Sequence, residues 1–290
     1  MPARTFGAGI GESSRSVTTR LHSLTQSKMT RIALGIEYDG STFCGWQRQS
    51  HAPSVQQTLE DSLSQVANEN ISVYCAGRTD SGVHALAQVV HFDTNATRPL
   101  RAWTMGTNSS LPPEVAVKWA ISAEENFHAR FSATSRTYQY VILNQALRPA
   151  VWGNRVTWEL RPLDADRMQI AALHWIGEHD FSSFRAAGCQ ANSPFRCIDL
   201  IKVRRLNAYV VVTVRANAFL HHMVRNLVGV LLDIGCGVKE PIWAQELLAA
   251  KNRQLAAKTA PPQGLYLCDV QYPQHCNIPA SNQSFPFLPD

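Results

Sequence analysis

The chain has 290 residues, of which 45% are hydrophobic and 17% are charged, and its formal net charge is +5. This composition excludes a disordered or fibrous protein and allows one large domain or two ordinary domains with a buried core. No apolar run reaches the roughly 18 residues that a membrane-spanning helix needs, so no membrane partner is expected.

The first 28 residues are expected to be a disordered extension. They are rich in Ser and Thr and hold four cationic residues against one acidic residue, Glu12. A transit peptide has a similar composition, but no clear amphipathic face can be drawn here, which favours disorder. Because this segment carries most of the net charge, a nucleic-acid partner would have to bind local basic patches elsewhere.

The seven cysteines predict neither a disulfide framework nor a zinc site. Their number is odd, and no C-x-x-C pair occurs. A reducing cytoplasm is therefore the expected location.

Residues 29–126 are predicted to form a first α+β unit. After its first strand, Ser54 is expected to begin a helix through an S-V-Q-Q capping box that ends at Gln57. The predicted strands cover 32–38, 71–76, 86–92 and 115–121, with a helical piece near 99–108. On the strand over 86–92, one face is expected to carry Leu86, Val90 and Phe92.

Residues 127–273 are predicted to form a second α+β unit, and residues 274–290 a loose tail. The predicted strands cover 137–143, 198–206, 209–216 and 264–272. One helix is expected over 217–234, and another with Pro241 at its first position. A third is expected after an Asp164 cap and would carry Met168, Leu173 and Ile176. Because strands and helices do not alternate regularly, we expect an α+β fold with a mostly antiparallel sheet and a ligand cleft between the units.

The stretch GRTDSG at residues 77–82 places a cation and a carboxylate two residues apart between two predicted strands. One interpretation is a solvated turn, since Asp, Ser and Gly are ordinary turn residues. Arg225, on the predicted helix over 217–234, is an available partner for Asp80. Pairing would keep the carboxylate ionised and oriented, as a nucleophile or a base requires.

Other polar and aromatic residues allow more than one interpretation. Tyr138 and Tyr140 share a strand face and could be core residues, or one could stack on a flat base. His221 and His222 would point about 100° apart on a helix, which favours a polar groove over a metal site. Arginines that could neutralise phosphates, or be ordinary surface charges, are Arg130, Arg136, Arg196, Arg204, Arg205 and Arg215.

The chain resembles the TruA family of bacterial tRNA pseudouridine synthases from about residue 29 to residue 272. The resemblance rests on YDGSTFCGWQRQ (38–49), AGRTDSGVHALAQVVHF (76–92), FHARFSATSRTYQYVI (127–142), HDFSSFR (179–185), NAFLHHMVRNLVG (217–229) and GLYL (264–267). The second of these is highly specific. The resemblance implies the pseudouridine synthase fold, in which two similar α+β halves share a mainly antiparallel sheet with helices packed on it and a central cleft.

The resemblance also implies an activity, the isomerisation of uridine to pseudouridine at positions 38, 39 and 40 of the tRNA anticodon arm. By motif, Asp80 would be the catalytic residue, and Arg225 would pair with it. Tyr138 would lie against the target base, and Arg78 would help to displace that base from the helix stack. Whether Asp80 attacks ribose C1′ or base C6, and whether Tyr138 is a base or only stacks, stays open.

The family further implies that no cofactor or metal is needed, and that the enzyme is a homodimer that binds the tRNA anticodon stem-loop. Two alternatives remain. One is a non-catalytic tRNA-binding or folding protein on the same scaffold. The other is a metal-dependent hydrolase or phosphotransferase that uses Asp80.

Overall fold

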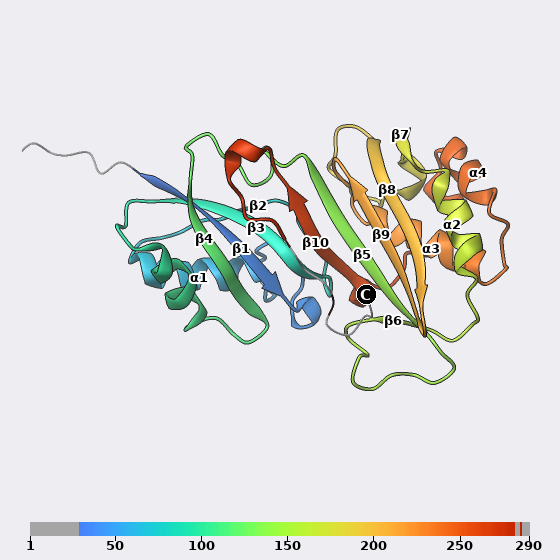
Figure 1. Ribbon diagram of the computed structural model, residues 1–290, viewed down its shortest axis with the longest axis horizontal. Coiled ribbons are helices and arrows are strands. Elements are labelled where there is room, and N and C mark those ends of the chain that lie inside the picture. The colour runs from blue at the N-terminus through green and yellow to red at the C-terminus, as the bar shows by residue number, and fades with distance from the viewer. Residues whose placement is uncertain (1–28, 282–284, 286–290) are drawn as a thin grey trace, which may run out of the picture.

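One ten-stranded sheet extends through the protein, in the order β4-β1-β3-β10-β5-β9-β8-β7, with β2 paired to β3 and β6 to β5 (Figure 1). The structure is a computed structural model that describes residues 29–281 and residue 285. Only the β3–β10 and β5–β6 pairs are parallel, so the predicted α+β fold with a mainly antiparallel sheet is confirmed. The strands are β1 Thr30–Tyr38, β2 Tyr74–Cys75, β3 His84–Thr94, β4 Val115–Ala123, β5 Ser135–Asn144, β6 Thr157–Glu159, β7 Gly177–Asp180, β8 Phe195–Leu206, β9 Tyr209–Ala216 and β10 Leu265–Gln271.

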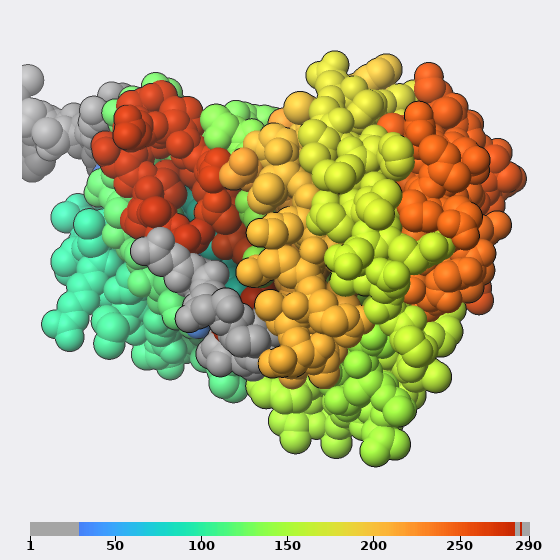
Figure 2. Space-filling model, turned by 45° about the vertical axis from the view of Figure 1, so that its right-hand side comes forward, coloured from blue at the N-terminus to red at the C-terminus, as the bar shows by residue number. Residues whose placement is uncertain are grey.

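The helices lie at the two ends of this sheet, α1 beside the N-terminal strands and α2, α3 and α4 beside the C-terminal ones (Figure 1). They are α1 Val55–Ala67, α2 Ala165–Leu173, α3 Met223–Gly235 and α4 Trp243–Ala250, with a π-helical turn at Ala102–Gly106. In Figure 2 the β8–β9 hairpin (gold) lies between the C-terminal residues (red) and the α2 region (yellow-green). Within the described residues, no helix has the length and apolar character needed to cross a bilayer.

Strand β10 joins the two units into one sheet. It pairs in parallel with β3, at Tyr266 and Leu267, and antiparallel with β5 on its other side. Residues 127–273 therefore complete the sheet that residues 29–126 begin. In the tail, Gln274–Cys276 forms a 3-10 turn and the Phe285 ring packs edge-on against Tyr266 at 4.7 Å; residues 1–28 lie outside the described residues.

The first helix forms as its sequence predicts. The Ser54 hydroxyl accepts a hydrogen bond from the backbone N–H of Gln57 at 3.3 Å, which satisfies one of the unpaired donors of the first turn. Val55, Leu59 and Leu63 are buried on the face toward the sheet core, as an amphipathic helix requires.

The predicted shared face on β3 is wrong. Between the pairs Ile36–Gln88 and Tyr38–Ala85, strand β3 contains one residue more than β1, which is a β-bulge. The bulge changes which side chains share a face, so Leu86 packs in a different apolar cluster from Val90. Beyond the bulge, the buried Gln88 side chain bonds the carbonyl of Gly77 in the loop that carries Asp80.

Several predicted boundaries are also wrong. The strand expected over 71–76 is only Tyr74–Cys75, because the Val73 N–H bonds the Glu60 carboxylate instead of a strand. On α2 the Asp164 cap and buried Met168 are confirmed, but Leu173 is 53% exposed, and Ile176 lies beyond the helix. Helix α4 starts two residues after Pro241.

The helix expected over 217–234 begins at Met223. Its N-cap, His222, has the left-handed backbone angle φ +59°, so the chain before it turns away from the helix axis. Asn217 contributes to that turn, because its side-chain oxygen accepts hydrogen bonds from the N–H groups of Cys197 and Ala218. Residues 218–222 are thereby directed into the cleft between the two units.

Candidate active site

A cleft of about 1110 Å³ lies between the two sequence units. The loop 76–83 lines it from the first unit, and the segments 128–138 and 218–225 contribute residues from the second unit. Asp80 is the only carboxylate among the described residues that line it. The arginines that line it are Arg78, Arg130, Arg136, Arg196 and Arg225.

The loop that carries Asp80 is held firmly between β2 and β3. Gly82 takes φ +76° in a turn closed by Asp80 and Val83, a conformation that glycine adopts without strain. The hydrogen bonds that anchor the loop are Tyr38 Oη with Thr79 Oγ1 (2.8 Å), Trp46 N to Thr79 O (3.0 Å), Gln88 Nε2 to Gly77 O (2.6 Å) and Val83 N to Asp80 O (3.1 Å). No supporting role was predicted from the sequence for Tyr38, Trp46 or Gln88, although all three lie in the quoted motifs, because contacts between residues so far apart in the chain leave no local signal.

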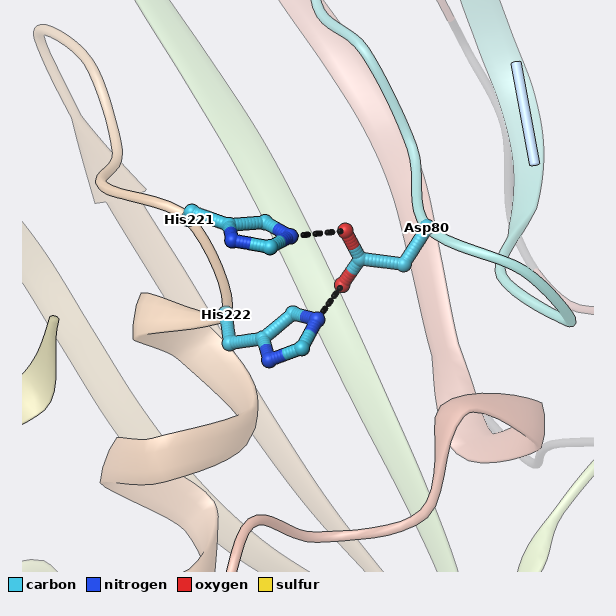
Figure 3. Close-up of side chains that lie close together, drawn as sticks. All are labelled: Asp80, His221 and His222. Carbon is cyan, nitrogen blue, oxygen red and sulfur yellow. Dashed lines mark ion pairs between the residues drawn. The ribbon is translucent and has the colours of Figure 1, made fainter. Parts of the chain in front are cut away.

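Three cationic or potentially cationic side chains surround the Asp80 carboxylate. Arg225 Nη1 lies 3.1 Å from Oδ2, and the Nε2 atoms of His221 and His222 lie 3.4 Å and 3.3 Å from the two oxygens. Figure 3 shows both imidazole rings pointing at the carboxylate from the segment before α3. The Asp80 side chain is 23% exposed and therefore remains accessible to a ligand in the cleft.

The predicted pairing of Asp80 with Arg225 is present in the structure. Arg225 lies in the first turn of α3, with its side chain 13% exposed. Its Nε also donates to the carbonyl of Ala260 at 2.8 Å, which fixes the guanidinium in place. A charged donor at this distance fixes the orientation of the carboxylate, as a positioned nucleophile requires.

The expected 100° divergence of the two histidines is wrong, because neither residue lies within a helix. Their rings are 4.0 Å apart and face the same carboxylate. Burial lowers the pKa of His222, and the charges of His221 and Arg225 act in the same direction, against the opposing effect of Asp80. His222 is therefore mainly neutral at pH 7, and can donate a hydrogen bond without adding a charge.

The donor atoms of Asp80, His221 and His222 lie within 4.8 Å of one another, a spacing that a metal ion could use. The guanidinium of Arg225 touches the same carboxylate and repels a divalent cation. Charge therefore favours the arginine pair over a metal at this position.

The two tyrosines of β5 have different environments. Tyr140 is fully buried, and its hydroxyl bonds Thr157 and the carbonyl of Pro261, as in an ordinary core residue. Tyr138 lines the cleft, and its ring lies edge-on to Phe219 at 5.1 Å. Burial and the nearby charge of Asp80 raise the pKa of Tyr138, so its phenol stays protonated at neutral pH.

The arginines of the cleft have distinct environments. Arg78 is exposed and makes no hydrogen bond or ion pair with any residue in the described part of the chain. Arg136 is buried and donates to backbone carbonyls of both units, including those of Ala76 and Asn217. Of the six arginines expected from the sequence to neutralise phosphates or to be surface charges, three do not line the cleft: Arg204, Arg205 and Arg215.

A fixed carboxylate at the centre of an arginine-rich cleft is the arrangement of an enzyme that acts on a large anionic substrate. Sequence comparison identifies the family. The profile of the tRNA pseudouridine synthase family matches residues 35–132 and 171–273. The chain belongs to this family.

Close relatives agree with that assignment. The chain is 56% identical over 260 residues to tRNA pseudouridine synthase A of Enterobacter sp. (strain 638), covering 90% of this chain and 96% of that protein. It is 55% identical over 267 residues to the Klebsiella pneumoniae protein of the same name, covering 92% and 99%. A solved Nop10–Cbf5 complex of the archaeal box H/ACA sRNP shares 12% identity over 69% of this chain and 44% of that chain, with a TM-score of 0.33, and adds nothing to the assignment.

Proposed function

We propose that this protein isomerises uridine to pseudouridine in tRNA, with Asp80 as the nucleophile. The observation that carries the proposal is the position of Asp80, which is partly exposed on a rigid loop, is paired with Arg225, and is the single carboxylate that the described residues bring to the arginine-lined cleft. The family and the names of the relatives supply the substrate and the reaction. A protein that only binds RNA has no need for a carboxylate among the arginines that contact its anionic ligand.

The reaction balances without a cofactor. The C1′–N1 bond of uridine breaks, a C1′–C5 bond forms, the hydrogen at C5 leaves as a proton, and N1 gains a proton. Asp80 attacks the nucleotide at C1′ or C6 and is released unchanged at the end. Tyr138, a protonated phenol on the cleft wall, packs against the base and holds it while it turns.

The target base must leave its stack before Asp80 can reach it, which costs a few kcal/mol. Arg78 precedes Asp80 by two residues, is exposed, and lines the same cleft. We assign to Arg78 the filling of the space that the base vacates. The finer features of the family belong to the same proposal: modification at positions 38, 39 and 40 of the anticodon stem-loop, a homodimer, and a cytoplasmic location.

The two units, residues 29–126 and 127–273, contribute different parts of the cleft wall. The first supplies Asp80 and Arg78, and the second supplies Tyr138 and Arg225. We propose that they are two halves of one catalytic body, that residues 1–28 lie outside it, and that the tail 274–290 is an appendage whose Phe285 packs on Tyr266 of β10.

The test is Asp80→Asn, which keeps the shape of the side chain and removes its charge. Chemical mapping of pseudouridine in tRNA incubated with wild type and variant should show product with wild type only. The variant should still bind tRNA, which separates lost chemistry from lost folding. Wild-type levels of product with Asp80→Asn would refute the role of this carboxylate.

A further inference from the structure

A continuous group of aromatic rings lines the cleft on the side of β2. Tyr74 stacks on His91 at 5.2 Å with an interplanar angle of 21°, and also contacts His128 at 5.5 Å. The His128 ring lies 4.3 Å from the ring of Phe131. Tyr74, His128 and Phe131 line the same cleft as Asp80.

The outermost ring of this group is unusually exposed for its type. Phe131 is 76% exposed, and Tyr74 is 57% exposed. A phenylalanine held in water gains nothing for folding, so its exposure at the edge of a binding cleft points to a ligand that covers it.

Hydrogen bonds fix the loop that presents Phe131. His128 Nδ1 accepts the backbone N–H groups of Arg130 and Phe131, at 3.1 Å and 3.3 Å. The Ser132 hydroxyl accepts from the N–H of His128 at 3.0 Å, and the buried Arg136 donates to the carbonyl of Arg130 at 2.6 Å. The exposed ring is therefore preformed and needs no ordering when a ligand binds.

The chemistry of this surface suits a nucleotide. Burial lowers the pKa of His91 to about 4 and also lowers the pKa of His128, so both rings are uncharged at neutral pH and behave as flat stacking surfaces. The Arg130 guanidinium lies 5.6 Å from the centre of the Phe131 ring. A flat apolar face beside a cation matches a base and the phosphate next to it.

We propose that Phe131, supported by His128 and Tyr74 and flanked by Arg130, is a stacking subsite for an unpaired nucleotide of the substrate RNA, distinct from the target uridine. A paired base inside a stem has both faces covered by its neighbours, so only a loop or terminal nucleotide can stack here. The inference rests on the proposed function to the extent that the ligand is RNA.

The first experiment compares tRNA affinity among three variants. Phe131→Leu keeps an apolar side chain but removes the ring, and should raise Kd by about 5- to 150-fold. Phe131→Trp keeps an aromatic ring and should bind tRNA with the affinity of wild type. The control is Phe195→Leu, because Phe195 is 52% exposed but lies outside the cleft, and its Kd should equal that of wild type. Equal Kd values for Phe131→Leu and wild type, with equal melting temperatures, would overturn the proposal.

The second experiment locates the nucleotide by removing bases from tRNA one at a time. For one unpaired position, tRNA that lacks the base should bind the wild-type protein as weakly as intact tRNA binds Phe131→Leu. Combining the abasic tRNA with Phe131→Leu should raise Kd no further. Additive losses at every unpaired position would overturn the subsite. These are binding measurements, so they remain decisive even if wild type were to form no pseudouridine, which is the outcome that would refute the proposed function.

Discussion

The contact between Asp80 and Arg225 joins two segments that are 145 residues apart in the chain, and its energy can be measured directly. Arg225→Met replaces the guanidinium with an apolar side chain of similar length. It removes a charged hydrogen bond to Asp80 and the bond from Nε to the carbonyl of Ala260. Both bonds come from the charged guanidinium, and a hydrogen bond of a charged group contributes about 1.5–3 kcal/mol.

The structure sets the expected size of the effect. Breaking a fully buried pair would cost about 3–5 kcal/mol. Asp80 is 23% exposed, and both His221 and His222 can still donate to it, so part of that cost is recovered. We expect Arg225→Met to lower the free energy of unfolding by about 2–3 kcal/mol.

The measurement is a double-mutant cycle in urea. Asp80→Asn alone should cost less than Arg225→Met, because Arg225 keeps its bond to Ala260. The double variant should be more stable than the sum of the single losses predicts, by about 1–2 kcal/mol. A coupling energy below about 0.3 kcal/mol would refute the view that this pair stabilises the site.

Four further predictions follow from other parts of the structure. Gly45→Ala should lower the free energy of unfolding in urea by about 1–3 kcal/mol, because Gly45 has φ +97° and a Cβ there would lie 3.0 Å from a backbone oxygen of the Asp80 loop. The control, Gly188→Ala, should lower it by less, because Gly188 has φ +77° but a Cβ there meets open space. The melting temperature should fall as the pH is lowered from about 6.5 towards 4, because His91 takes up a proton in the unfolded protein but, in the folded protein, only near its lowered pKa of about 4. His91→Gln should flatten this profile, and an unchanged slope would contradict the role of His91 in it. A chelator should leave pseudouridine formation unchanged, because the arginine charge beside Asp80 opposes a metal, and loss of turnover restored by added metal would favour a metal-dependent enzyme. Deleting residues 1–28 should leave turnover and tRNA affinity intact, and a rise in Kd would instead identify this segment as a basic arm.

Local patterns predicted most of the elements. The Ser54 hydroxyl caps α1 and the Asp164 carboxylate caps α2, because capping depends only on residues within one turn. The hairpin of β8 and β9 also forms at the predicted turn, where Asn207 takes φ +55°. What failed depends on contacts distant in sequence: the bulge in β3 is visible only against β1, and no periodicity in residues 86–92 reveals it.

For the site, the sequence predicted the Asp80–Arg225 contact but not the geometry around it. The apolar spacing from Phe219 to Ile234 continues smoothly through His221 and His222, so a helix over 217–234 was the natural prediction. The helix is interrupted at its start because Asn217 bonds to Cys197 on β8. This contact, together with the hydrogen bonds of the His221 backbone to Cys189 and Ala186, holds the segment in which both imidazole rings face Asp80 (Figure 3).

The central position of β10 has a consequence for how the protein is made. Its residues lie near the end of the chain, yet they pair with β3, about 180 residues earlier, and with β5 on the other side. Until the ribosome has released residues 265–271, the facing edges of β3 and β5 have no partner strand between them, and long-range pairing of this kind forms slowly. A chain that has not yet made residues 265–271 therefore lacks the strand that unites its two units, so the cleft between them can form only after β10 has been added.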